Sequence, residues 1–157
     1  MAFLAVTFLL AGCGTTASTP DSPHPESRSS SSSIPRVPPS GLQSKYRVAI
    51  PEDAVDVTYG EKSEWGRSDF WVSFRLPAEK AGDFLKAIGL TGHFRAWSFP
   101  FTPADLTMAG WQVTPGPNTR GGTIPVADDS VHAPSRSVVI DQSVPDWPKV
   151  YALSSIA

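Results

Sequence analysis

The sequence predicts an α+β protein, in which a small antiparallel sheet of four to six strands is packed by one main helix and preceded by a disordered linker. Three observations lead to this prediction. Several short segments of residues 45–157 alternate apolar and polar residues, the pattern of strands with one buried face. One segment between them has the apolar spacing of a helix. Residues 13–44 are dominated by Ser, Pro and Thr, and such a composition buries too little apolar surface to fold.

Three strands are expected in the first half of the head domain, as we call residues 45–157. Alternating apolar residues mark the segments 46–50 and 55–59. The clearest strand is 70–76, in which Trp71 falls on the opposite face from the apolar residues that alternate around it. The polar stretch 60–68 is expected to be a loop that joins the last two strands as a hairpin.

The main helix is predicted over residues 77–89. Its apolar residues recur at positions i, i+3, i+4 and i+7: Ala81, Phe84, Leu85 and Ile88. Pro77 suits the first helical position, and Gly89 suits the position just after the end. The apolar side of this helix should pack on the sheet face that carries Phe70, Val72 and Phe74.

A second, shorter helix and two further strands complete the domain. Thr102 and Asp105 have the spacing of a capping box, and Gly110 would end the short helix. Segments 136–141 and 149–156 alternate like strands and are separated by the turn sequence QSVPDWP. The expected order is therefore β-β-β-α-(short α)-β-β, with sequential antiparallel pairing.

The chain's single cysteine follows directly on an apolar stretch at its N-terminus. Residues 2–11 carry no charge and are shorter than the roughly 17 to 25 residues of a membrane-spanning helix, but they have the length of a signal-peptide core. The tetrad Leu10-Ala11-Gly12-Cys13 resembles the lipobox of bacterial lipoproteins. This resemblance implies that residues 1–12 are a signal peptide, that Cys13 becomes the lipidated first residue, and that palmitate-type acyl chains anchor the protein on the outer face of the bacterial cytoplasmic membrane.

The segment between the anchor and the head domain is expected to be a flexible tether. As a coil, about 32 residues span roughly 30 Å. The chain is poor in Lys and Asn and rich in Arg, Ala, Gly and Pro, and in this composition and layout it loosely resembles small actinobacterial lipoproteins of unknown function. An alternative is that this segment has no role in reach.

Charge and motifs exclude some function classes. The head domain carries slightly more acidic than basic residues and no basic stripe, which argues against nucleic acid as a partner. Nucleotide-binding, zinc-protease and serine-hydrolase motifs are absent, although Ser68-Asp69 after Gly66 is the nearest approach to a nucleophile elbow. No cofactor and no metal ion are expected.

The candidate binding residues are indoles and polar residues of one long segment. Exposed indoles stack on sugar rings and peptides, and the candidates among them are Trp71, Trp111 and Trp147; the alternative is that they belong to the core. Residues 112–135 form the longest stretch without periodicity apart from a short strand around 123–126. Its candidate residues are Arg120, Asp128, Asp129 and His132.

Three functions remain open from the sequence. The first is a lipid-anchored extracytoplasmic protein whose head domain binds an envelope protein or a cell-wall polymer, with the membrane as a partner through the lipid. The second is a cell-envelope hydrolase that uses His93 or His132 with an acid. The third is an inhibitor or assembly factor of a membrane-bound partner. The missing catalytic motifs favour a binding protein over an enzyme.

Overall fold

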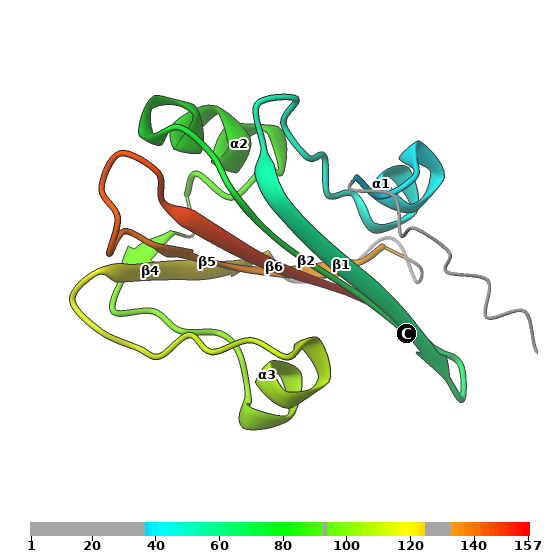
Figure 1. The fold of residues 1–157 in the computed structure, drawn as a ribbon. Coiled ribbons are helices and arrows are strands. Elements are labelled where there is room, and N and C mark those ends of the chain that lie inside the picture. Colours follow the sequence, from blue (N-terminus) through cyan, green and yellow to red (C-terminus); the bar gives the residue numbers. More distant parts are fainter. Residues whose placement is uncertain (1–36, 93, 125–132) are drawn as a thin grey trace, which may run out of the picture. The chain divides into compact units, whose positions relative to one another are not determined.

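The structure is a computed structural model that describes residues 37–92, 94–124 and 133–157 (Figure 1). In this part of the chain, six strands form one antiparallel sheet in the order β1-β2-β6-β5-β4-β3. The strands are β1 (Val55–Glu64), β2 (Arg67–Arg75), β3 (Arg95–Ala96), β4 (Thr119–Ile124), β5 (Ser135–Asp141) and β6 (Lys149–Ile156). The predicted α+β class and antiparallel sheet are confirmed. β4 overlaps the predicted short strand around 123–126, whose last two residues lie outside the described part.

The prediction of one main helix is wrong. Three helices of seven residues each are present among the described residues: α1 (Ser40–Tyr46), α2 (Ala81–Ala87) and α3 (Pro103–Ala109). Figure 1 shows α1 and α2 on one face of the sheet, which we call the first face, and α3 on the second face. The predicted helix over 77–89 is shorter than expected because its first turn is a 3-10 helix, η1 (Ala78–Lys80).

Strands that follow one another in the sequence are neighbours in the sheet, except that β2 pairs with β6 and not with β3. β6 lies between β2 and β5, and it pairs with β2 over residues 149–156 and with β5 over residues 149–155. The reason is visible in its side chains, since residues 150–154 are all buried. β6 therefore contributes to the cores on both faces of the sheet, as is typical of a central strand rather than an edge strand.

The first face carries the larger core. Phe74 meets Phe84 of α2 edge to face at 5.3 Å, and Tyr46 of α1 stacks on Phe70 at 5.1 Å. The predicted packing of the helix on the face of Phe70, Val72 and Phe74 is therefore confirmed. The buried residues of this core are Tyr46, Val48, Phe70, Val72, Phe74, Leu76, Phe84, Ile88, Leu90, Val138, Ile140, Val150 and Ala152.

The strand predicted over residues 46–50 is wrong. Tyr46 is the last residue of α1, and Arg47 has left-handed backbone angles with φ 52° that end the helix. The side chain of Gln43 then holds the next residues, because its amide oxygen accepts from the Ile50 N–H at 2.9 Å. Alternating burial thus arises here from a helix end followed by an extended segment. The predicted boundary of the head domain at residue 45 falls inside α1.

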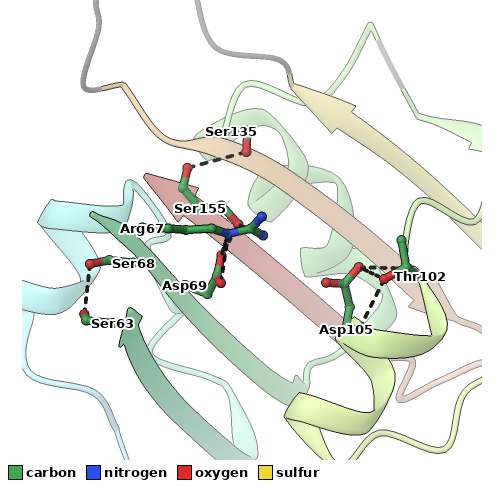
Figure 2. Close-up of polar contacts among 8 residues, drawn as sticks. All are labelled: Ser63, Arg67, Ser68, Asp69, Thr102, Asp105, Ser135 and Ser155. Carbon is green, nitrogen blue, oxygen red and sulfur yellow. Dashed lines mark hydrogen bonds and ion pairs between the residues drawn. The ribbon is translucent and has the colours of Figure 1, made fainter. Parts of the chain in front are cut away.

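A smaller, aromatic core lies on the second face, under α3 and the segment 97–118. Its buried residues are Phe101, Trp111, Val113, Val139, Tyr151 and Leu153. The predicted capping box is confirmed: the Asp105 N–H donates to Thr102 Oγ1 at 3.2 Å, and the Thr102 N–H donates to the Asp105 carboxylate at 2.8 Å (Figure 2). Gly110, with φ 66°, ends the helix as predicted.

The predicted loop over residues 60–68 is mostly strand. β1 and β2 continue to Glu64 and Arg67, and only Trp65 and Gly66 form the turn, with φ values of 47° and 82°. Two consecutive left-handed residues are the geometry of the tight turn that suits the twist of a hairpin. The stretch is polar because β1 is an edge strand whose residues near the turn are exposed.

Candidate functional site

An arginine-lined pocket of about 500 Å³ opens at the margin of the first face. It lies where α1, the end of α2 and β5 meet, and we call it the arginine pocket. Its lining consists of Ser40, Gln43, Ser44, Arg47, Ala49, Ala87 and Arg136. Two guanidinium groups and two hydroxyl groups thus surround one cavity, and every lining residue except Ala87 and Arg136 comes from a stretch of ten residues.

The fold brings the two arginines together through β6. Arg136 is paired with Ser154 across β5 and β6, so both side chains lie on the first face. The hydroxyl of the fully buried Ser154 donates to the Tyr46 carbonyl at 2.8 Å, which fixes the end of α1 above the strand. Arg47 follows directly, and its left-handed backbone turns the chain at the rim of the pocket.

The Arg136 guanidinium is only partly satisfied by the protein. Its Nη1 donates to the Ile88 carbonyl at 2.9 Å and, at 3.4 Å, to the Arg47 carbonyl. Its Nε is buried and has no hydrogen-bond partner among the described residues. Burial lowers the pKa of Arg136, and the neighbouring charge of Arg47 lowers it further. A buried donor without an acceptor is costly. A ligand in the pocket would instead meet the parts of the Arg47 and Arg136 side chains that line it.

The charge of the pocket is also uncompensated within the described residues. No carboxylate of this part of the chain lies within 4.0 Å of either guanidinium. An arginine presents a planar fork of donors that matches the oxygens of phosphate or carboxylate. The arrangement can therefore bind an anionic group, with the hydroxyls of Ser40 and Ser44 as additional donors.

A second cavity, of about 590 Å³, lies on the second face beside α3. The rings of Trp111 and Tyr151 line it, but they are only 9% and 5% exposed and offer little surface for stacking. Among its polar groups, the hydroxyls of Thr58 and Ser73 are 2.8 Å apart and satisfy each other, and the Lys149 ammonium lies 5.1 Å from the centre of the Tyr151 ring. This cavity makes a weaker demand for a ligand than the arginine pocket does.

None of the predicted binding residues that the structure describes lines the arginine pocket. Trp111 is buried in the second core, and Trp71 is half-buried against it, so neither indole is an open stacking platform. Trp147, 41% exposed, lies in the turn between β5 and β6. Arg120 is exposed on β4. The predicted residues Asp128, Asp129 and His132 lie outside the described residues, as does His93.

Sequence reasoning missed the residues that form the pocket. A signal for Arg136 was present, because the alternation of its strand places it on the same face as Val138 and Ile140, where a charge is unexpected. Nothing comparable marked Arg47, whose position depends on the end of α1. The most exposed indoles, Trp65 at 104% and Trp97 at 69%, were also not among the candidates.

The approach to a nucleophile elbow at Ser68-Asp69 is a pair of ordinary strand residues. Ser68 lies 2.9 Å from the hydroxyl of Ser63, and Asp69 is held by Arg67 and Ser155 (Figure 2). Neighbours in a strand point to opposite faces, so Asp69 does not orient Ser68. In residues 37–92, 94–124 and 133–157, no group of three His, Cys, Asp or Glu side chains could hold a metal ion. No helix of this part is long and apolar enough to cross a membrane.

Comparison with known proteins gives no family for the chain. No family model matches it, and no curated protein or solved structure matches it either. The functional argument therefore depends on the residues of this chain alone.

Proposed function

We propose that this protein is a lipid-anchored extracytoplasmic binding protein whose head domain holds an anionic group in the arginine pocket. Cys13 carries the lipid, residues 13–37 form the tether, and the protein is anchored on the outer face of the bacterial cytoplasmic membrane. The observation that carries the binding role is the convergence of the Arg47 and Arg136 side chains in one pocket, with no carboxylate of the described residues within 4.0 Å of either guanidinium.

Binding is favoured over catalysis by the lining of the pocket. General acid-base chemistry needs a group that gains and loses a proton near neutral pH, such as His, Asp, Glu or Cys. None of these types occurs among the described residues that line the arginine pocket. Two permanently charged guanidinium groups and several hydroxyls suit a group that is held and released unchanged.

The ligand class is a phosphate or a carboxylate presented by a larger molecule. A cell-wall polymer offers both chemical groups, and an envelope protein offers an acidic side chain or its C-terminal carboxylate. The pocket is open to such attached groups because α1 forms one of its walls and both Ser40 and Ser44 are exposed. The tether would let the head domain reach these ligands at about 30 Å from the membrane.

Thermal unfolding of the detergent-solubilised chain tests the pocket. Inorganic phosphate and acetate are the probes, and bound ligand raises the midpoint temperature as its concentration passes the dissociation constant. We expect a concentration-dependent rise for the native chain and for Arg120→Met, which removes an exposed arginine of β4. The rise should disappear in Arg136→Met. An equal rise in Arg136→Met, or none in the native chain with either anion, contradicts the proposed site.

Labelled palmitate fed to producing cells tests the anchor separately. The native chain should become labelled and remain with the membrane after a high-salt wash, whereas Cys13→Ala should do neither. An unlabelled native chain that washes off refutes the anchored location without bearing on the anion site.

A further inference from the structure

The tip of the β1–β2 hairpin carries a tryptophan that the fold does not use. Trp65 is 104% exposed and therefore touches almost nothing in the domain. Its φ of 47° is left-handed, a strained conformation for a residue other than glycine. A large apolar side chain that is both fully exposed and in a strained conformation is a candidate for contact with something outside the domain.

The hairpin holds this indole on a rigid base. Directly behind the tip, the hydroxyls of Ser63 and Ser68 lie 2.9 Å apart across the two strands. Arg67 forms an ion pair with Asp69 at 3.0 Å, and the Ser155 hydroxyl of β6 also donates to Asp69 (Figure 2). The tip is thus tied to the centre of the sheet.

The charges around the indole neutralise one another. Lys62 pairs with Glu64 at 3.0 Å, just as Arg67 pairs with Asp69. Apart from Met108 of α3, the residues that line the hollow beside Trp65 are these four charged ones. A single indole therefore projects from a polar and electrically balanced tip.

The hairpin tip lies toward the same side of the domain as α1 (Figure 1). α1 is the first described element after residues 37–39, and Lys45 at its end donates to Glu61 near the tip at 2.7 Å. The C-terminal strand also ends here, since Ile156 pairs with Ser68. Figure 1 shows α1, the hairpin tip and the C-terminus toward the same side of the domain. If residues 13–37 form the tether expected from the sequence, a coil of this length spans about 25–30 Å.

We propose that Trp65 inserts into the headgroup region of the same membrane that holds the lipid on Cys13. The inference rests on the proposed anchoring. Tryptophan is enriched at membrane interfaces because its ring is apolar and its N–H reaches water. Paired charges of both signs suit zwitterionic headgroups. A protein hot spot instead surrounds its indole with a ring of further contacts that exclude water. The described residues that line the hollow beside Trp65 are four charged ones and Met108.

A thiol label tests this in the full lipidated chain. Trp65→Cys introduces the only reactive thiol if Cys13 is lipidated, and it can carry an environment-sensitive fluorophore. In phosphatidylcholine vesicles we expect a blue-shifted emission and several-fold stronger quenching by nitroxide-labelled lipid than for Trp97→Cys. The control is matched because Trp97 is also exposed and also left-handed, with φ 64°.

Each outcome separates the two proposals. Equal quenching at both positions, or a label at position 65 that is open to an aqueous quencher, overturns insertion. Shielding of position 65 only after addition of solubilised envelope proteins also overturns it and indicates a protein partner. If the thiol-reactive fluorophore labels the native chain, the anchor is refuted, because Cys13 is the only cysteine of the chain and would then carry no lipid. If the native chain does not react with the fluorophore and the label at position 65 stays in water, insertion alone is refuted.

Discussion

The two faces of the sheet are built from the same strands but are covered differently. The first face is closed by two short helices over aliphatic and phenylalanine side chains, while the second is closed by α3 and an irregular segment over larger aromatic rings. β5 and β6 serve both cores with adjacent residues, as Val138 and Val139 show. Continuous burial of central strands makes such a two-sided sheet possible.

The difference shows where function can be placed without loss of stability. The arginine pocket lies at the margin of the first face, and Trp65 lies at the tip of the hairpin that β1 and β2 form at one end of the sheet. Neither Arg47 nor Trp65 belongs to one of the two cores. The centre of each face should thus respond to substitution through stability, and the margins through binding.

The largest effect is expected in the first core. Phe74 is 0% exposed and packs edge to face with Phe84, so Phe74→Ala leaves a cavity and should lower the free energy of unfolding by about 3–5 kcal/mol. Leu106→Ala, at a half-buried position of α3, should cost no more than about 2 kcal/mol. Urea unfolding measures both. A larger loss for Leu106→Ala would mean that the second face is the main source of stability.

Two glycines give a finer test on the second face. A Cβ on Gly121 would lie 2.6 Å from the Ser98 carbonyl oxygen and 2.9 Å from that of Val138, and backbone cannot move aside cheaply. Gly121→Ala should cost about 2–3 kcal/mol. A Cβ on Gly60 would instead meet the half-buried indole of Trp71, which can shift, so Gly60→Ala should cost about 1 kcal/mol. Equal losses in urea unfolding would show that Trp71 is fixed as firmly as backbone.

A pH titration separates the margin of the first face from its core. Hydrogen bonds from Lys45 and then Tyr46 lower the pKa of Glu61 below its ordinary 4.5. A lowered pKa stabilises the fold above pH 4.5, and this contribution is lost as the pH falls through the lowered value. Glu61→Gln should remove it, which is a difference of at most about 1 kcal/mol for so exposed a group.

Unfolding free energies at pH 7 and at pH 3 provide the measurement. Glu64→Gln, on the same strand, is the control because its carboxylate makes only an exposed ion pair with Lys62. The native chain and Glu64→Gln should lose more stability on acidification than Glu61→Gln. An identical loss in all three chains would remove Glu61 as a cause.

The sequence was sufficient for those elements whose signals are local. The 70–76 strand, the capped helix at Thr102 and the packing of Phe84 on the sheet all follow from periodicity and end residues within a short window. The position of β6 between β2 and β5 was not predictable from sequential pairing alone. It depends on which strand contributes to the cores on both faces of the sheet. The polar hairpin was missed because an exposed edge strand lacks an apolar face.

The arginine pocket was hidden for a different reason. Its residues come from α1, α2 and β5, and no motif joins segments that far apart in the chain. Only Arg136 had a local signal, as a charge on a buried face. The tryptophans were visible in the sequence, but their exposure was not. The sequence does not distinguish Trp111, which the fold buries, from Trp65, which it leaves fully exposed.

The smallest effect is expected at the hairpin tip, and it has the opposite sign. Trp65→Asn places an Asn-Gly pair in a turn whose two residues both have positive φ, the sequence that such turns favour. Because the indole packs against almost nothing, its removal loses no contact, and relief of the left-handed strain should raise the free energy of unfolding by about 0.5 kcal/mol. Trp97→Asn, at a site that is 69% exposed, should gain less because part of its packing is lost.

A loss of stability in Trp65→Asn would mean that the indole supports the fold after all. A higher free energy of unfolding for Trp65→Asn together with weaker binding to vesicles would mean that Trp65 serves membrane contact and lowers the stability of the fold.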